Sequence, residues 1–292
     1  MKLPSRNILI FNGVAGVIML LGAFSMARAL VTKPEVPTCT ARSDVYARSY
    51  TLSLEREGEP VRLADFQSEL NGTDFGVADH MRIRALTTGP ARAVMIVSMG
   101  KGSSSPKSAN GYLGGVSFPW RPDDLAGKKS VCLVYHMFLP VDFNFGAGGT
   151  LPGITGGLRD RPEDGSITEY IARLVWRRDG DVALVGAKVE RNQRKVEAIH
   201  GKGAVPKLER GKWVQIQQEF QPNDPGAANG VFRLWVGGKL AIDRADVNFL
   251  AHPNQYLAGV STDVHFGNEL TEQTSPKDQQ IFLTPMQLYY SE

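Results

Sequence analysis

Short apolar runs interrupted by polar residues and turns dominate the chain beyond residue 80, and they predict strands rather than helices. The alternation is clearest at residues 213–220, where Val214 and Ile216 point to one side and Gln215 and Gln217 to the other. Ten segments fit the strand pattern: residues 82–86, 93–99, 113–118, 130–139, 170–178, 182–189, 213–220, 230–236, 260–266 and 281–289. Ten short strands with hardly any helix predict an all-β protein, an antiparallel β-sandwich of the jelly-roll kind.

The region before these strands is less regular. Residues 46–54 alternate loosely and form a further, weaker strand candidate, whereas residues 61–70 are the best helix candidate. We therefore expect residues 30–72 to be a linker and N-terminal extension, and residues 73–292 to form the sandwich domain.

The first 29 residues have the composition of a targeting segment. They combine a positively charged start, an apolar run at residues 8–24 and the small-x-small sequence ARA at 27–29. The apolar run is at the short limit for a membrane span, so the segment fits both a cleaved signal peptide and an uncleaved signal anchor. Either one predicts an exported protein that is periplasmic or secreted, or that is tethered to the inner membrane by this segment alone.

Charge and the pattern of cysteines and histidines limit the partners that the protein is expected to have. Lys and Arg number 33 and Asp and Glu 30, a net charge of +3 that suits an acidic polymer. No basic motif interleaved with aromatic residues points to nucleic acid. Five scattered histidines and no Cys-x-x-Cys spacing predict no metal site, and we expect no cofactor.

Two cysteines, Cys39 and Cys132, leave two interpretations open. An oxidising compartment would allow a disulfide between the N-terminal extension and the strand at 130–139. Alternatively, Cys132 is a small buried core residue. We favour the second interpretation, because spacing alone does not establish disulfide geometry.

Period-two alternation also separates the candidate side chains within each strand. At 170–178 the odd-numbered residues, which include Arg173 and Arg177, share one face and the even-numbered residues share the other. An arginine in a strand that otherwise reads as buried is costly unless it has a partner or a ligand. Tyr135 and His136 face opposite sides, so at most one of them lines a given surface.

A glycine-rich stretch follows the strand candidate at 130–139. Six glycines lie between residues 146 and 157, and this density predicts a loop whose backbone can approach a ligand closely. The sequence GGTLPGITGG at 148–157 resembles the GGKLPGLxGG loop of alginate and glucuronan lyases of the polysaccharide lyase 14/20 type.

Other segments extend the resemblance in chain order over roughly residues 85–290. They are MGKGSSSP at 99–106, GGVSF at 114–118, RLVWR at 173–177, NGVFRLWVGGK at 229–239, and VHFGN at 264–268 with SPKD at 275–278. The resemblance implies a β-jelly roll with a long concave groove, in agreement with the strand count.

The resemblance also implies a reaction, the β-elimination of a uronic-acid polymer. This chemistry needs a group that neutralises the C6 carboxylate, a base for the C5 proton and an acid for the leaving oxygen. Family members use a Lys in the GGKLPG loop and tyrosines on the strand after the Trp-Arg strand. Here the Lys position is Thr150, and residues 181–188 contain no tyrosine. A threonine hydroxyl is too weak an acid or base to replace either group without an activating neighbour.

Four residues are candidates for catalysis. Arg173 matches the family motif and is expected to bind a carboxylate through its guanidinium fork, with a salt bridge inside the sheet as the alternative. His136 is a candidate base near neutral pH, and Tyr135 and Lys188 are candidate proton-transfer groups. The alternatives are a structural histidine and a solvated lysine at a strand end.

Six further residues are candidates for substrate binding, namely Thr150, Gln215, Gln217, Lys101, Arg177 and Trp235. The glutamines suit sugar hydroxyls or a carboxylate, and a tryptophan can stack on a sugar ring, although a sandwich more often buries it. Two functions are therefore open: an exported lyase acting on an acidic polysaccharide such as alginate or glucuronan, and a binder of such a polysaccharide without catalysis.

Overall fold

The computed structural model describes residues 36–70, 72–108, 113–123, 125–158, 169–190, 193–201, 205–250, 255–267 and 273–292. The expected targeting segment at residues 1–29 and the first residues of the expected linker lie outside the described residues. The chain divides into two compact units, Met1–Val36 and Pro37–Glu292, and all described helices and strands belong to the second.

Strands make up most of the second unit. They are β1 (Arg48–Leu52), β2 (Glu55–Arg56), β3 (Glu59–Pro60), β4 (Met81–Ala85), β5 (Ala93–Met99), β6 (Val116–Trp120), β7 (Ser130–Phe138), β8 (Gly148–Leu158), β9 (Glu169–Arg177), β10 (Val182–Glu190), β11 (Gln193–Ile199), β12 (Trp213–Gln221), β13 (Gly230–Val236), β14 (Lys239–Val247), β15 (Gln255–Phe266), β16 (Gln279–Leu283) and β17 (Met286–Ser291).

The described helices are short. They are α2 (Leu63–Ser68), α3 (Val77–His80) and the 3₁₀ turns η1 (Cys39–Ala41) and η2 (Arg178–Gly180). Helix α2 confirms the helix predicted at 61–70, and its buried Phe66 packs edge-on against Phe118 with the ring centroids 5.5 Å apart. No helix in the described part of the chain is both long and apolar enough to cross a membrane.

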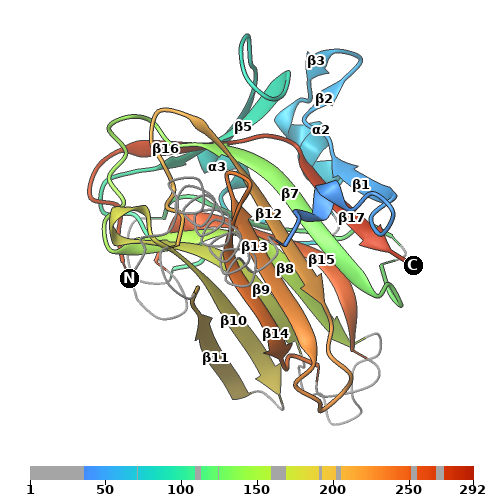
Figure 1. Ribbon diagram of the computed structural model, residues 1–292. Coiled ribbons are helices and arrows are strands. Elements are labelled where there is room, and N and C mark those ends of the chain that lie inside the picture. Colours follow the sequence, from blue (N-terminus) through green and yellow to red (C-terminus); the bar gives the residue numbers. More distant parts are fainter. Residues whose placement is uncertain are drawn as a thin grey trace, which may run out of the picture. The chain divides into compact units, whose positions relative to one another are not determined.

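Two antiparallel sheets form the sandwich (Figure 1). The nine-stranded sheet has the order β14-β13-β12-β7-β16-β5-β4, and β17 joins β7 to β1 beside this path. The six-stranded sheet has the order β11-β10-β9-β8-β15-β6. The predicted antiparallel sandwich is therefore confirmed.

Alternate residues of both sheets meet in one apolar core. On the nine-stranded sheet Ile216 and Phe220 of β12 point inward, and on the six-stranded sheet Tyr170 and Trp176 of β9 do so. The ring centroids of Tyr170 and Phe220 lie 5.5 Å apart across the two sheets. Residues with the opposite parity lie on the outer faces, and these outer faces carry most of the candidate functional groups.

Two predictions about local structure are wrong. The segment 281–289 is two strands, β16 and β17, separated at Thr284 and Pro285, because proline cannot donate a ladder hydrogen bond. The predicted glycine-rich loop at 148–157 is strand β8. Its glycines serve packing, since a Cβ on Gly149 would lie 2.0 Å from the Trp176 ring and one on Gly153 would lie 2.2 Å from the Arg173 Cα.

A disulfide joins Cys39 to Cys132, 93 positions apart in the sequence, with their Cα atoms 6.2 Å apart. The favoured interpretation of Cys132 as an unpaired core residue is therefore wrong. The bond holds residues 37–46, which we call the N-terminal strap, against the outer face of β7 and β12. Sequence spacing could not reveal this, because the contact depends on where the strap lies against the sheet.

Candidate functional site

A cluster of buried polar side chains lies on the outer face of the six-stranded sheet. Arg173 of β9 pairs with Asp263 of β15, with 3.0 Å between Arg173 Nη1 and Asp263 Oδ2. His265 follows two positions after Asp263 on the same face, and all three side chains are buried. We call Arg173, Asp263 and His265 the outer cluster.

Strand β8 brings the two halves of this cluster together. Gly153 is the register partner of Arg173 on one side and of Ser261 on the other. A side chain at Gly153 would collide with the Arg173 backbone, and its absence allows the three strands to approach closely. The glycine thereby places β9 and β15 so that Arg173 reaches across β8 to Asp263.

Opposing effects act on the Asp263 carboxyl. Its burial alone would raise its pKa, but the Arg173 guanidinium, with His265 and the hydroxyls of Ser117 and Ser261, lowers the pKa to about 2. Asp263 is therefore ionised throughout the physiological range. The cluster thus holds a buried anion and a buried cation in contact.

The His265 ring has a defined tautomer at one nitrogen. Nδ1 lies 2.9 Å from the carbonyl oxygen of Phe266, and since a carbonyl only accepts hydrogen bonds, Nδ1 carries the proton. In the neutral ring, Nε2 then carries the lone pair.

Thr150 lies beside this histidine, as its register partner between β8 and β15. Its hydroxyl is fully buried and donates to the carbonyl of Gly267 over 2.8 Å. The Thr150 side chain is therefore engaged with the backbone.

The neighbouring strand β10 contributes apolar side chains to the same outer face. Ala183 and Val185 are buried and cluster with Val175 of β9. Strand β10 contains no tyrosine, and Ala183 and Val185 take outward positions on it. Among described side chains on this face, His265 provides an imidazole.

A protein-family model matches the region of the chain that contains most of these strands. The model for polysaccharide lyase 14 matches residues 87–286, which is more than half of the chain. The chain belongs to the polysaccharide lyase 14 family.

Solved structures share the fold of this family member. An alginate lyase of the family from the marine Aplysia kurodai is 19% identical with a TM-score of 0.62, covering 83% of this chain and 98% of that one. A variant of the alginate lyase Aly36B in complex with an alginate tetrasaccharide is 17% identical with a TM-score of 0.51, covering 67% and 80%.

The endo-β-1,4-glucuronan lyase from the fungus Trichoderma reesei is 8% identical with a TM-score of 0.55, covering 84% and 95%. No curated protein sequence matches the chain. The likeness confirms the jelly-roll fold that the resemblance predicted.

The other candidate catalytic residues of this lyase-family chain lie away from the outer cluster. Tyr135 points into the core, where burial raises the pKa of its hydroxyl. Lys188 is the register partner of the inward-facing Tyr170, so it leaves β10 on the face opposite to Arg173. Its Nζ donates to the carbonyl of Asn248 over 3.3 Å.

His136 lies on the other sheet. It is half-buried on the outer face of the nine-stranded sheet, and burial lowers its pKa. Tyr135 and His136 do face opposite sides, as the alternation predicted. The structure does not bring His136 together with Arg173.

The predicted glutamines also belong to the outer face of the nine-stranded sheet. Gln217 Nε2 donates to Thr40 Oγ1 of the N-terminal strap over 2.9 Å and to Gln215 Oε1 over 2.8 Å. Trp235, the register partner of Gln217, is buried. The strap thus occupies the hydrogen-bonding groups of Gln217.

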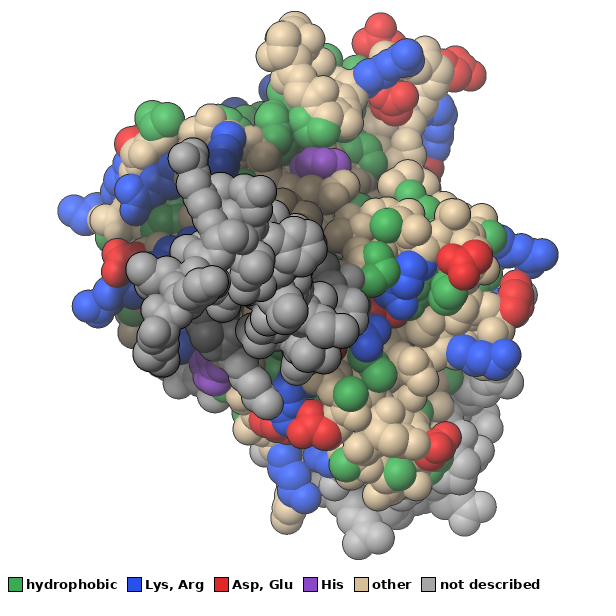
Figure 2. Space-filling model, in the orientation of Figure 1, with side chains coloured by type: hydrophobic (Ala, Val, Ile, Leu, Met, Phe, Trp, Pro, Cys, Tyr) green, Lys and Arg blue, Asp and Glu red, His purple; other side chains and the backbone are tan. Residues whose placement is uncertain are grey.

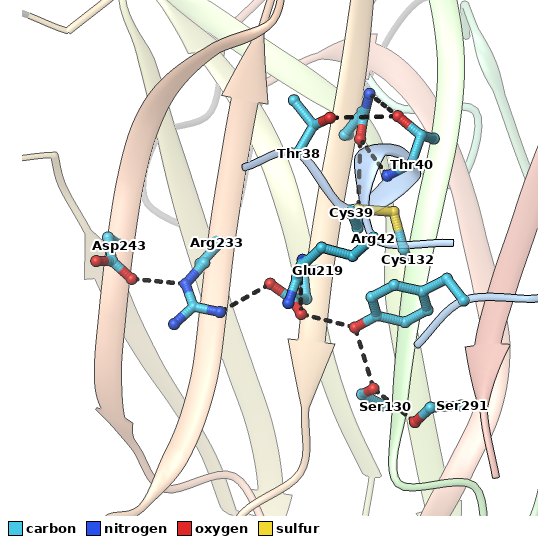
Figure 3. A network of polar contacts seen from close by, with 12 residues as sticks. Thr38, Cys39, Thr40, Arg42, Ser130, Cys132, Glu219, Arg233, Asp243 and Ser291 are labelled. Carbon is cyan, nitrogen blue, oxygen red and sulfur yellow. Dashed lines mark hydrogen bonds and ion pairs between the residues drawn. A yellow bond between two sulfur atoms is a disulfide. The ribbon is translucent and has the colours of Figure 1, made fainter. Parts of the chain in front are cut away.

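A charged network continues along this face beneath the strap (Figure 3). The buried Glu219 carboxylate pairs with Arg42 over 2.6 Å and with Arg233 over 3.0 Å, and it accepts a hydrogen bond from Tyr46 over 2.7 Å. Arg233 also pairs with Asp243. The network and the disulfide together explain why the strap has a fixed place on the sheet.

Two predicted binding residues are exposed. Arg177 lies at the end of β9 on the face of Arg173, and Lys101 lies in the turn after β5, where its backbone N–H donates to Asp278 over 2.7 Å. Figure 2 shows Lys and Arg side chains interspersed with Asp and Glu on the described part of the face in view. Recognition of an anion would therefore depend on individual side chains.

Asp263 and His265 were not predicted as site residues from the sequence. Their signal was available, because Ser261, Asp263 and His265 alternate with the apolar Val260 and Val264. No three His, Cys, Asp or Glu side chains gather into a possible metal site among the residues that the structure describes.

Proposed function

We propose that the protein is a lyase for an acidic polysaccharide, which it cleaves by β-elimination at the outer cluster. The observation that carries the proposal is the buried arrangement of Arg173, Asp263 and His265 on one sheet face of a polysaccharide lyase 14 family member. Alginate and glucuronan are the polymers named for structurally similar lyases, so uronic-acid polymers are the proposed substrate class.

Each step of the elimination has a group in the cluster. Arg173 would bind the C6 carboxylate, which makes the C5 proton more acidic.

His265 would move the proton. Its Nε2 takes the proton from C5, the electron pair of the C5–H bond forms the C4=C5 double bond, and the C4–O4 bond breaks. The leaving O4 then takes the proton back from Nε2. Asp263 does not touch the substrate in this scheme and keeps Arg173 in position.

A second function has its own supporting observations. Thr150 stands where the family has a lysine and donates to Gly267, and Ala183 and Val185 occupy outward positions on the strand that carries tyrosines in the family. These substitutions favour an acidic-polysaccharide binder that does not cleave.

A comparison of cleavage and binding separates the two functions. Alginate, polyglucuronate and hyaluronate are incubated with the full-length protein, and ultraviolet absorbance follows the unsaturated uronic-acid product. We expect product from one polymer, and a rate at least about 100-fold lower in His265→Gln with binding retained. Arg62→Gln, an exposed charge outside the strands of both sheets, is the control.

Wild-type protein that binds a polymer but forms no unsaturated product would establish the binder instead. Unchanged cleavage by His265→Gln would show that another group moves the proton.

We further propose that the protein is exported to the periplasm or secreted, or tethered through its N-terminal segment. The targeting composition of residues 1–29 and the disulfide between Cys39 and Cys132 support export to an oxidising compartment. Cell fractionation with mass measurement of the mature N-terminus tests it, and a cytoplasmic protein with free thiols would refute it.

A further inference from the structure

A row of partly exposed rings crosses the outer face of the nine-stranded sheet. Trp213 of β12 is the register partner of Phe138 of β7, which is the partner of Phe282 of β16. Phe282 pairs in turn with Ile96 of β5, and Ile96 with Arg82 of β4. Five neighbouring strands thus place one side chain each in a single line, which we call the ring row.

The members of the row are in contact but not buried. The ring centroids of Phe138 and Trp213 lie 5.5 Å apart, and those of Phe138 and Phe282 lie 5.8 Å apart. Trp213, Phe138, Phe282 and Ile96 are all partly exposed, whereas the other three tryptophans of the chain are buried. Apolar side chains of this size that stay at the surface in a continuous line indicate a binding surface.

Trp213 is held in place by its surroundings. The loop before β5 lies against the edge of its indole, since a Cβ on Gly89 would come within 3.0 Å of Trp213 Nε1. A ring that is already ordered loses little conformational entropy when a ligand stacks on it. The row is therefore preorganised.

Polar groups border the rings on both sides. Gln215 and His136 are register partners in the next row, and Gln280 lies beside Ser98 with 3.2 Å between Nε2 and Oγ. Burial lowers the pKa of His136, so the ring is neutral at pH 7 and keeps one donor and one acceptor. Rings flanked by amides and an imidazole suit a ligand with apolar faces and many hydroxyls, which describes a sugar.

The end of the row carries positive charge. Arg82 and Arg84 project from β4 and are exposed, and neither pairs with an acidic side chain in the part of the chain that the structure describes. With an interstrand spacing of about 4.8 Å, the row extends for about 19 Å from Trp213 to Arg82, enough for several sugar rings in line. Charge complementarity therefore selects an anionic polysaccharide as the occupant.

We propose that the ring row is a second carbohydrate-binding site, which takes the pyranose rings of an acidic polysaccharide and binds its carboxylates at Arg82. The site belongs to the nine-stranded sheet, whereas the outer cluster belongs to the six-stranded sheet. It shares with the proposed function only the class of ligand and does not require cleavage.

Binding by the full-length protein tests the proposal. Affinity for long alginate and polyglucuronate chains is measured by calorimetry and affinity electrophoresis. We expect Trp213→Leu to bind about tenfold more weakly, and Trp213→Phe to recover most of the affinity. Arg82→Gln should weaken binding and reduce its salt dependence, whereas Arg62→Gln, an exposed charge outside the row, should not.

The outcomes separate this proposal from the proposed function. Absence of unsaturated product with loss of binding in Trp213→Leu supports the second site and refutes only the lyase. Wild-type affinity in a folded Trp213→Leu variant overturns the second site, whatever the cleavage result. A change in oligomeric state of Trp213→Leu with unchanged polymer affinity would make the row a protein interface and also overturn the proposal.

Discussion

Removal of the Arg173 side chain is expected to cost more stability at pH 7 than at pH 4. Arg173→Ala leaves the Asp263 carboxylate buried without its guanidinium partner, which lies 3.0 Å away in the native protein. Breaking a buried ion pair on one side typically costs about 3–5 kcal/mol. We expect a loss of this size at pH 7.

The pKa of Asp263 sets the pH dependence. It is about 2 in the folded protein against 3.8 for an unperturbed aspartate, which corresponds to about 2 kcal/mol of stability at neutral pH. Because the folded-state pKa is depressed, this stability is fully present above about pH 4 and is lost as the pH falls through about 2. In Arg173→Ala, burial instead raises the pKa, so protonation of Asp263 near pH 4 should relieve part of the penalty.

Urea denaturation at pH 7 and pH 4 measures the effect. The loss in Arg173→Ala should be smaller at pH 4 by at least about 1 kcal/mol, and Arg177→Ala, exposed on the same strand, should stay within about 0.5 kcal/mol of wild type. An equal loss at both pH values, or a loss below about 1 kcal/mol at pH 7, would refute the reasoning.

A double replacement provides a further check. Arg173→Met combined with Asp263→Leu removes both charges and keeps most of the side-chain volume, so it should recover much of the stability lost in Arg173→Ala. Lost activity in Arg173→Ala alone would not identify a role in the reaction, since the fold is affected too. His265→Gln is therefore the sharper test of the chemistry.

Two further predictions concern the strap and strand β8. Cys132→Ser should lower the free energy of unfolding, measured with urea, by about 4 kcal/mol, because the disulfide closes a loop spanning 93 positions. Reductant should lower the urea midpoint of the wild type but not that of the variant. A variant with the wild-type midpoint would contradict the prediction. Gly153→Ala should prevent normal packing, because its Cβ would lie 2.2 Å from the Arg173 Cα, and so should abolish the near-ultraviolet circular dichroism of the folded protein. Gly100→Ala is the control and should fold normally, because the atom nearest to its Cβ would be 3.8 Å away.

The fold could be predicted where side-chain alternation was strong. Residues 213–220 alternate clearly and form β12, and Arg173 and Trp176 lie on opposite faces of β9 as predicted. Strand β8 was missed because its glycines have the composition of a loop. Their role depends on Trp176 and the Arg173 backbone in the neighbouring strand, which local composition does not show.

The site was predicted only in part, for a related reason. Alternation shows which side of a strand a residue occupies, but not which sheet the strand joins. His136 was therefore grouped with Arg173, although β7 and β9 belong to different sheets. The cost of burying Arg173 predicted a partner or ligand, but Asp263 is ninety residues away in sequence and is brought close only by the pairing of β8 with β15.

The strand order of the nine-stranded sheet has a consequence for how the protein folds. Strand β16 pairs with both β5 and β7, and β17 pairs with both β1 and β7, so residues near the end of the sequence fill the middle of the sheet. Such long-range pairings slow folding, because the chain must close large loops before the contacts form. During synthesis, the edges of β1, β5 and β7 would stay open to pairing with other chains until residues 279–291 have been added.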